Sequence, residues 1–166
     1  MTRRNVRLAR WAMTPIVLGI ASMIFQACHP EPPIDPRIWR WMTCIECIDR
    51  EQADVVAMGP SAIPALRYLL IEGPPDTTIA RKTDALNAPY REDAANATMV
   101  APPASYVASR IDDFAARYRV RSSLALGLIG TDSARRALCT ARLMQLRPDV
   151  RRFVDSGLVL LNGACP

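Results

Sequence analysis

The sequence predicts an all-α domain, and three observations carry that prediction. Half of the 166 residues are hydrophobic but only 6% are aromatic, so a core must consist mainly of Ala, Leu, Ile and Val. Seven glycines against fourteen prolines are few for the many tight turns of an all-β chain. Beyond residue 44, apolar residues recur at helical spacing. A chain of this length has room for one ordinary domain, which excludes a TIM barrel or a polytopic transporter.

The N-terminal segment has the pattern of an export signal. Arginines stand at positions 3, 4, 7 and 10, residues 11–27 carry no charge, and the first acidic residue is Glu31. As a helix the uncharged stretch would span about 25 Å, slightly less than the roughly 30 Å hydrocarbon core of a bilayer. A basic start followed by a short apolar stretch is typical of a secretory signal. We therefore expect residues 1–27 to be a signal peptide or, alternatively, an uncleaved anchor helix.

The residues that end this stretch, Phe25-Gln26-Ala27-Cys28, resemble the lipobox of bacterial lipoproteins. In that family the chain is cut just before the cysteine, which carries a lipid, so the resemblance implies that Cys28 is the lipidation site. Gln26 departs from the small residue that the family usually has there. Residues 28–37 are rich in proline, which favours an extended tether. The resemblance implies a membrane-anchored protein of the bacterial cell envelope, with its domain on the periplasmic or extracellular side.

Most of the basic excess belongs to this N-terminal segment. Residues 1–27 hold four arginines and no acid, so without them the formal net charge falls from +5 to +1. The remaining domain is evenly mixed and has no basic stripe. We therefore expect no nucleic acid among its partners.

Four cysteines follow Cys28, and an even number in an exported chain favours disulfides. They are Cys44, Cys47, Cys139 and Cys165, which permit three pairings among which the sequence does not choose. A bridge from Cys139 to Cys165 would tie the penultimate helix to the C-terminus. We expect no metal site and no cofactor, because the one histidine, His29, lies in the tether.

Cys44 and Cys47 form a CxxC motif, which raises a redox function as the alternative. Thr43 and Glu46 have the spacing of a capping box, so Cys44 would be the first residue of a helix. At that position the helix dipole stabilises a thiolate. Thioredoxins use this placement, but their motif follows a strand, and no strand pattern precedes Cys44. A structural disulfide is the preferred interpretation, and an envelope thiol–disulfide redox protein is the alternative function.

Proline and glycine divide the region 38–166 into helices. Residues 38–72 predict a helical hairpin, with a first helix from about Cys44 to Met58 and a break at Gly59 and Pro60. Residues 76–103, which prolines interrupt, predict a surface loop or a degenerate repeat. A long helix over 104–129 is followed by a helix at about 134–146 and by a last helix after Pro148.

Two of the predicted turns align, the first beginning at Gly59 and the second at Gly130, 71 residues further on. That spacing is about twice the length of a helix-pair repeat. The segments 57–66 and 119–130 resemble HEAT-type repeats, at the turn between two helices and at the end of a first helix. The resemblance implies a short α-solenoid of antiparallel helix pairs that serves as an interaction scaffold for a protein partner.

No catalytic site is predicted. With no histidine in the domain, a Ser-His-Asp or Cys-His arrangement has no candidate base. Asp112 and Asp113 are adjacent on the predicted long helix, so we expect them to point in different directions on a solvated face. Asp113 and Arg117 have the i,i+4 spacing of a helical ion pair.

Overall fold

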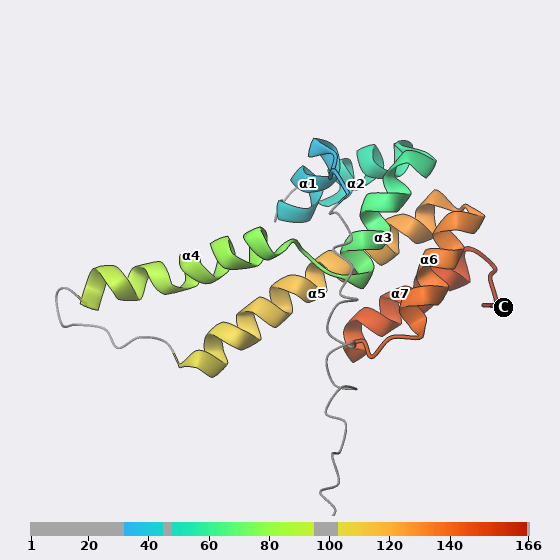
Figure 1. Ribbon diagram of the computed structural model, residues 1–166. Coiled ribbons are helices and arrows are strands. Elements are labelled where there is room, and N and C mark those ends of the chain that lie inside the picture. The colour runs from blue at the N-terminus through green and yellow to red at the C-terminus, as the bar shows by residue number, and fades with distance from the viewer. Residues whose placement is uncertain (1–31, 45–47, 95–102, 166) are drawn as a thin grey trace, which may run out of the picture. The chain divides into compact units, whose positions relative to one another are not determined.

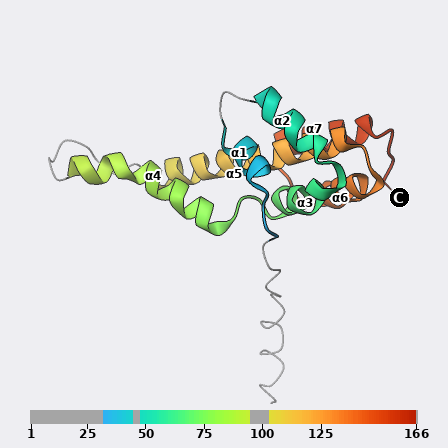
Figure 2. The ribbon, with the colours of Figure 1, turned by 90° about the horizontal axis from the view of Figure 1, so that it is seen from above.

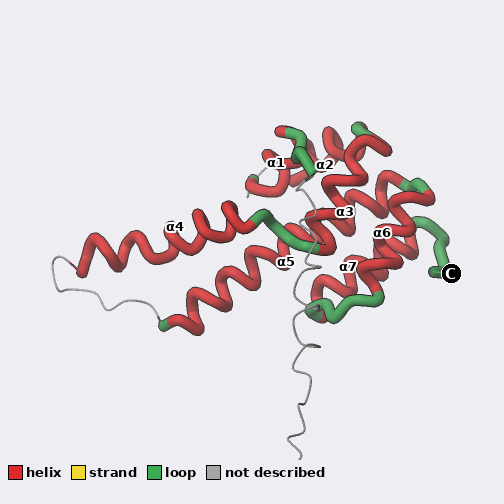
Figure 3. Tube along the Cα trace, viewed as in Figure 1, coloured by secondary structure: helices red, strands yellow, loops and turns green. Residues whose placement is uncertain are grey.

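The structure is a computed structural model of the chain, and it describes residues 32–44, 48–94 and 103–165. In these ranges every regular element is a helix (Figures 1 and 3). The elements are α1 (Pro36–Thr43), α2 (Ile48–Ala57), the 3₁₀ helix η1 (Gly59–Ala62), α3 (Ile63–Ile71), α4 (Asp76–Ala94), α5 (Ala104–Ile129), α6 (Asp132–Arg142) and α7 (Pro148–Leu160). The all-α prediction is confirmed for this part of the chain. The predicted signal segment 1–27, and the tether up to residue 31, lie outside it.

Helix α5 is the centre of the domain and packs against each of the other α-helices. Its buried residues all lie from Ala116 onward, whereas its first half runs beside α4 (Figures 1 and 2). The core consists mainly of Ala, Leu, Ile and Val, as the composition predicts. Its two large aromatic members, Trp41 and Tyr118, are almost fully buried.

Two arginines of α5 close the C-terminal ends of other helices. The Nη2 of Arg119 donates to the carbonyls of Ile71 and Glu72, at 3.4 and 3.3 Å, where α3 ends. Arg121 donates to the carbonyls of Trp41 and Cys44 where α1 ends. The last carbonyls of a helix have no partner within that helix, and its negative end favours a cation. These hydrogen bonds therefore fasten α1 and α3 to α5.

Helix α1 lies partly inside the predicted tether 28–37, which is a correction. It begins at Pro36, and Asp35 is its N-cap, with a carboxylate that accepts a hydrogen bond from the backbone N–H of Arg37 at 2.8 Å. Proline suits the first turn because the N–H that it lacks would have no partner there. A cap residue followed by proline is thus a helix start here and not an extended spacer.

Residues 76–94 form the helix α4, so a loop is the wrong description for this part of 76–103. The helix runs through Pro89, although proline in a helix interior removes a hydrogen bond and crowds the preceding turn. Helix α4 packs mainly on α5, and its apolar residues Ile79 and Leu86 are only half-buried. A helix that packs mainly on one neighbour needs few apolar side chains, which explains why no sustained helical period marks it. Residues 95–102 lie outside the described ranges.

The boundaries of the later helices follow the predicted signals, except that α6 ends at Arg142 and not at about residue 146. Helix α5 spans the predicted range and ends at Gly130, whose φ of 77° is left-handed. Helix α6 begins two residues before the predicted start, because Thr131 is its N-cap and accepts from the N–H of Ala134 at 3.3 Å. Helix α7 begins at Pro148, which stands in its first turn.

No single helix in the described ranges is long and apolar enough to cross a membrane. Two helical segments, Arg50–Ala57 and Gly59–Ile71, are long and apolar enough only when taken together, and the chain bends by 103° between them. Most of the apolar side chains of the second segment belong to the buried core.

Candidate functional site

The structure joins Cys139 of α6 to Cys165 by a disulfide, with 5.5 Å between their Cα atoms. Both residues are half-buried against the hydrophobic core. The bridge spans a sequence separation of 26 and fastens the segment after α7 to α6. This is one of the pairings that the sequence allows.

Cys44 of the CxxC motif is itself disulfide-bonded, and its partner is not among the described residues. Cys47 and the predicted lipidation site Cys28 also lie outside them. The prediction that Cys44 begins a helix is wrong, because Cys44 is the C-cap of α1. Thr43 is the last residue of that helix and donates its hydroxyl to the carbonyl of Trp39 at 3.0 Å, instead of capping a following helix. The negative end of a helix disfavours a thiolate, so the electrostatic argument for a reactive Cys44 is lost.

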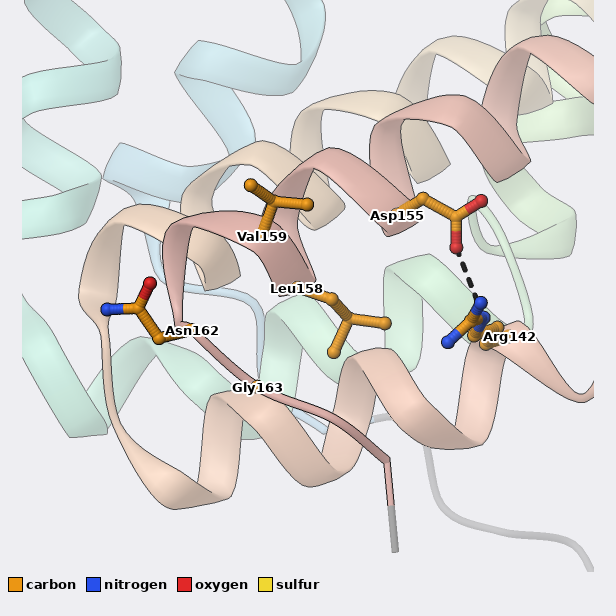
Figure 4. A pocket seen from close by; sticks show the side chains of 6 residues that line it. All are labelled: Arg142, Asp155, Leu158, Val159, Asn162 and Gly163. Atoms are coloured by element: carbon orange, nitrogen blue, oxygen red, sulfur yellow. Dashed lines mark ion pairs between the residues drawn. The ribbon is translucent and has the colours of Figure 1, made fainter.

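A shallow pocket of about 390 Å³ lies between α6 and the end of α7 (Figure 4). Leu158 and Val159 give it apolar walls, and Asn162 and Gly163 close one side. At the opposite side Arg142 of α6 forms an ion pair with Asp155 of α7, at 3.2 Å. The pocket thus combines apolar side chains with a charged rim.

Large apolar side chains are exposed at the ends of α6 and α7. Val159 is 75% exposed, and Leu143, which follows Arg142 at the end of α6, is 89% exposed. We call the pocket residues together with Leu143 the C-terminal surface. Single exposed apolar residues are common on proteins, whereas exposed apolar side chains that lie together mark a candidate binding surface. Sequence reasoning missed this surface. A signal was present, because Val159 lies off the apolar stripe that Val150, Val154 and Leu158 form on α7 and is therefore expected to be exposed.

Asp112 and Asp113 lie on a solvated face, as predicted, but they do not point apart, which is a correction. Both accept hydrogen bonds from Nη1 of Arg147, at 2.6 and 2.9 Å, and Asp149 accepts from its Nη2 at 2.9 Å. Asp113 is therefore paired with Arg147 and not with Arg117. Arg147 precedes α7, so this cluster joins the start of α7 to the first half of α5.

The charges of this cluster hold one another in the ionised form. The hydrogen bonds that Arg147 donates to Asp149, Asp113 and Asp112, in that order of effect, raise its pKa above the ordinary value. The Arg147 guanidinium in turn lowers the pKa of Asp149, an effect that the backbone N–H of Val150 supports and partial burial opposes. Because one guanidinium engages all three carboxylates, the cluster is a structural ion-pair network and not a pair of catalytic acids.

No group of three or more His, Cys, Asp or Glu side chains that could hold a metal ion occurs in the described ranges. The described residues bring no nucleophile together with a histidine base, because the chain's one histidine, His29, lies outside them. No protein-family model, no curated protein and no solved structure matches this chain.

Proposed function

We propose that the chain is a membrane-tethered protein of the bacterial cell envelope whose helical domain binds a protein partner. The observation that carries the proposal is the C-terminal surface, where Val159 is mostly exposed at a pocket and Leu143, directly after the pocket residue Arg142, is also mostly exposed. Burying such side chains against a partner removes apolar area from water, which is the main favourable term in protein association. The Arg142–Asp155 ion pair supplies the polar rim that such interfaces usually have.

The stacking of helix pairs supports a HEAT-like scaffold as the architecture. The two aligned turns each contain a glycine with positive φ, 58° at Gly59 and 77° at Gly130. The helices before these turns, α2 and α5, pack against each other, and so do the helices that follow, α3 and α6. In a solenoid, equivalent helices of successive units stack in this way. In the proposed array α7 adds a further layer, and its outer side carries Val159.

Site-specific photo-cross-linking tests the proposed partner surface. A photoreactive amino acid is placed at position 159 of the full-length chain in its native envelope, and the control places it at position 152 on the same helix, where Arg152 is exposed. We expect one discrete adduct from position 159 and none from position 152. A Leu143→Asp substitution should weaken the adduct, because it puts a charge in the interface. Equal adduct patterns from both positions would contradict the proposal.

The tether rests on the sequence pattern alone and has its own test. The basic start, the uncharged stretch 11–27 and Cys28 support an export signal with a lipid anchor. Mass spectrometry of the protein extracted from membranes should give a mature N-terminus at Cys28 with lipid attached. An unmodified Met1 at the N-terminus would rule out the lipoprotein.

The thiol–disulfide alternative has less support. Its electrostatic basis was the start of a helix at Cys44, whereas Cys44 lies at the end of α1. Thiol trapping with an alkylating agent distinguishes the two functions. Rapid labelling of Cys44 under native conditions supports the redox function, and protection of Cys44 supports a structural disulfide.

A further inference from the structure

A second, smaller cavity of about 130 Å³ lies where the end of α1 meets α4 and α5. Figure 2 shows α1 and the start of α4 near the middle of α5. The cavity is lined by three cationic side chains, Lys82, Arg117 and Arg121, and by the rings of Phe114 and Tyr118. None of the described residues that line it has a carboxylate.

The cations are held close together although they repel one another. The Nζ of Lys82 and the guanidinium of Arg117 both lie over the ring of Phe114, 5.9 and 5.8 Å from its centre. Cation–π attraction keeps the two charges beside the cavity. Neither side chain forms an ion pair with any residue in the described ranges. Their charges are therefore available to an anion.

Arg121 is fixed in place by α1 and still has donors to offer. It donates to the carbonyls of Trp41 and Cys44, and a guanidinium carries five N–H groups. Burial, followed by repulsion from Arg117, lowers the pKa of Arg121. A bound anion would counteract this shift, because an opposite charge stabilises the protonated guanidinium.

Tyr118, which also lines the cavity, provides evidence for a ligand that does not depend on the charges. The residue is 1% exposed, yet its hydroxyl has no hydrogen-bond partner among the described residues. A buried hydroxyl without a partner is costly, and such groups in native structures usually have an ion or water that completes them. Burial also raises the pKa of Tyr118, so the hydroxyl keeps its proton and can donate it.

We infer that this cavity binds a carboxylate group, held by the Tyr118 hydroxyl and by the charges of Lys82, Arg117 and Arg121. A carboxylate presents about four lone-pair sites, which match one hydroxyl and several N–H donors. The small volume admits a carboxylate with the carbon that bears it, and Phe114 and Met42 give that carbon an apolar wall. The site shares no residue with the C-terminal surface, so a failure of either proposal leaves the other untouched.

The test titrates the full-length chain, in detergent, with sodium acetate against sodium chloride at constant ionic strength. Saturation-transfer NMR on the acetate methyl group reports the binding. The variants are Tyr118→Phe, which removes only the hydroxyl, and Arg117→Gln, which removes one charge. Arg152→Gln, on the exposed side of α7, is the matched control for loss of a charge. We expect saturable binding that is about tenfold weaker in Tyr118→Phe, as for loss of a hydrogen bond to a charged group.

Further arms identify the anion and its source. Inorganic phosphate in place of acetate should bind less well, and saturation by phosphate alone would overturn the carboxylate assignment. A capped peptide with a single Glu, compared with its Gln counterpart, separates a protein-borne carboxylate from a free acid; tighter binding than acetate assigns the protein source.

The last measurement compares the free energies of unfolding of Tyr118→Phe and of the original chain, both without ligand. Without a ligand, Tyr118→Phe should be as stable as the original chain or more stable, because the lost hydroxyl had no partner. Acetate binding that is equal in all variants, or a clear loss of stability in Tyr118→Phe, would overturn the inference.

Discussion

Gly127 of α5 and Gly157 of α7 meet where the two helices cross. A Cβ added to Gly127 would lie 2.8 Å from the Cα of Gly157 and 3.2 Å from its carbonyl oxygen. A Cβ on Gly157 would lie 3.0 Å from the carbonyl oxygen of Ser123. The helices are thus in backbone contact, which explains two glycines inside helices despite their cost in conformational entropy.

Gly127→Ala should destabilise the domain. The added methyl group meets backbone and not a flexible side chain, so α5 and α7 must move apart. Overpacking of this kind costs about 1–3 kcal/mol, of which the better helix propensity of alanine returns about 1 kcal/mol. Urea unfolding followed by circular dichroism measures the difference. Ser156→Ala, on the exposed side of α7 next to this crossing, should be nearly neutral, and an unchanged Gly127→Ala would show that the helices are not in contact.

Arg147→Gln should lower the stability modestly. The substitution removes the hydrogen bonds to Asp112, Asp113 and Asp149 and leaves three carboxylates close together. Because all four side chains are partly exposed, we expect a loss of about 1 kcal/mol or less. The loss should shrink at high salt, which screens exposed charges. Arg152→Gln is the control for charge alone, and an equal effect from it would mean that the cluster contributes nothing.

The contribution of this cluster should depend on pH with a definite sign. Arg147 lowers the pKa of Asp149 in the folded state, so the network stabilises the fold fully above the ordinary Asp pKa of about 4. It is lost as the pH falls through the lowered pKa of Asp149. The difference in unfolding free energy between the original chain and Arg147→Gln should therefore be constant from pH 6 to 8 and vanish in strong acid. A difference that grows on acidification would contradict this assignment.

Replacing Cys139 and Cys165 together with alanine should cost more than any of these changes. A bridge across this sequence separation of 26 destabilises the unfolded chain by about 3.5 kcal/mol in the chain-entropy model. Chemical denaturation with and without reductant measures the effect. Reductant should lower the stability of the original chain by more than it lowers that of the double variant. Equal losses in the two proteins would mean that the Cys139–Cys165 bridge has no stabilising role.

Sequence reasoning found the helices that strong local signals delimit. The prolines before Ala104 and the left-handed Gly130 fix both ends of α5, and Pro148 fixes the start of α7. It missed α1 because Pro36 was assigned to a tether, although Asp35 before it is a favoured N-cap. It missed α4 because only Thr78 is buried among its residues 76–90, so the helix has almost no apolar period.

Local sequence patterns could not predict the ion-pair cluster, the cavity or the C-terminal surface, because these depend on contacts between residues far apart in the sequence. The contact of Asp112 with Arg147 spans 35 residues and exists only once α7 packs on α5. The sequence places Tyr118 on the buried stripe of its helix, but it does not reveal that the hydroxyl lacks a partner. Exposure of Val159 follows from its place at the outer side of α7, which depends on the packing of the whole domain.

The arginines of α5 also set an order of assembly. The carbonyls at the end of α3 find their donor 47 and 48 residues later in the chain, and those at the end of α1 find theirs 77 and 80 residues later. Such long-range contacts form slowly, because a large loop must close first. As the chain emerges from the ribosome, the carbonyls at the ends of α1 and α3 therefore lack these donors until residues 119–121 have been made.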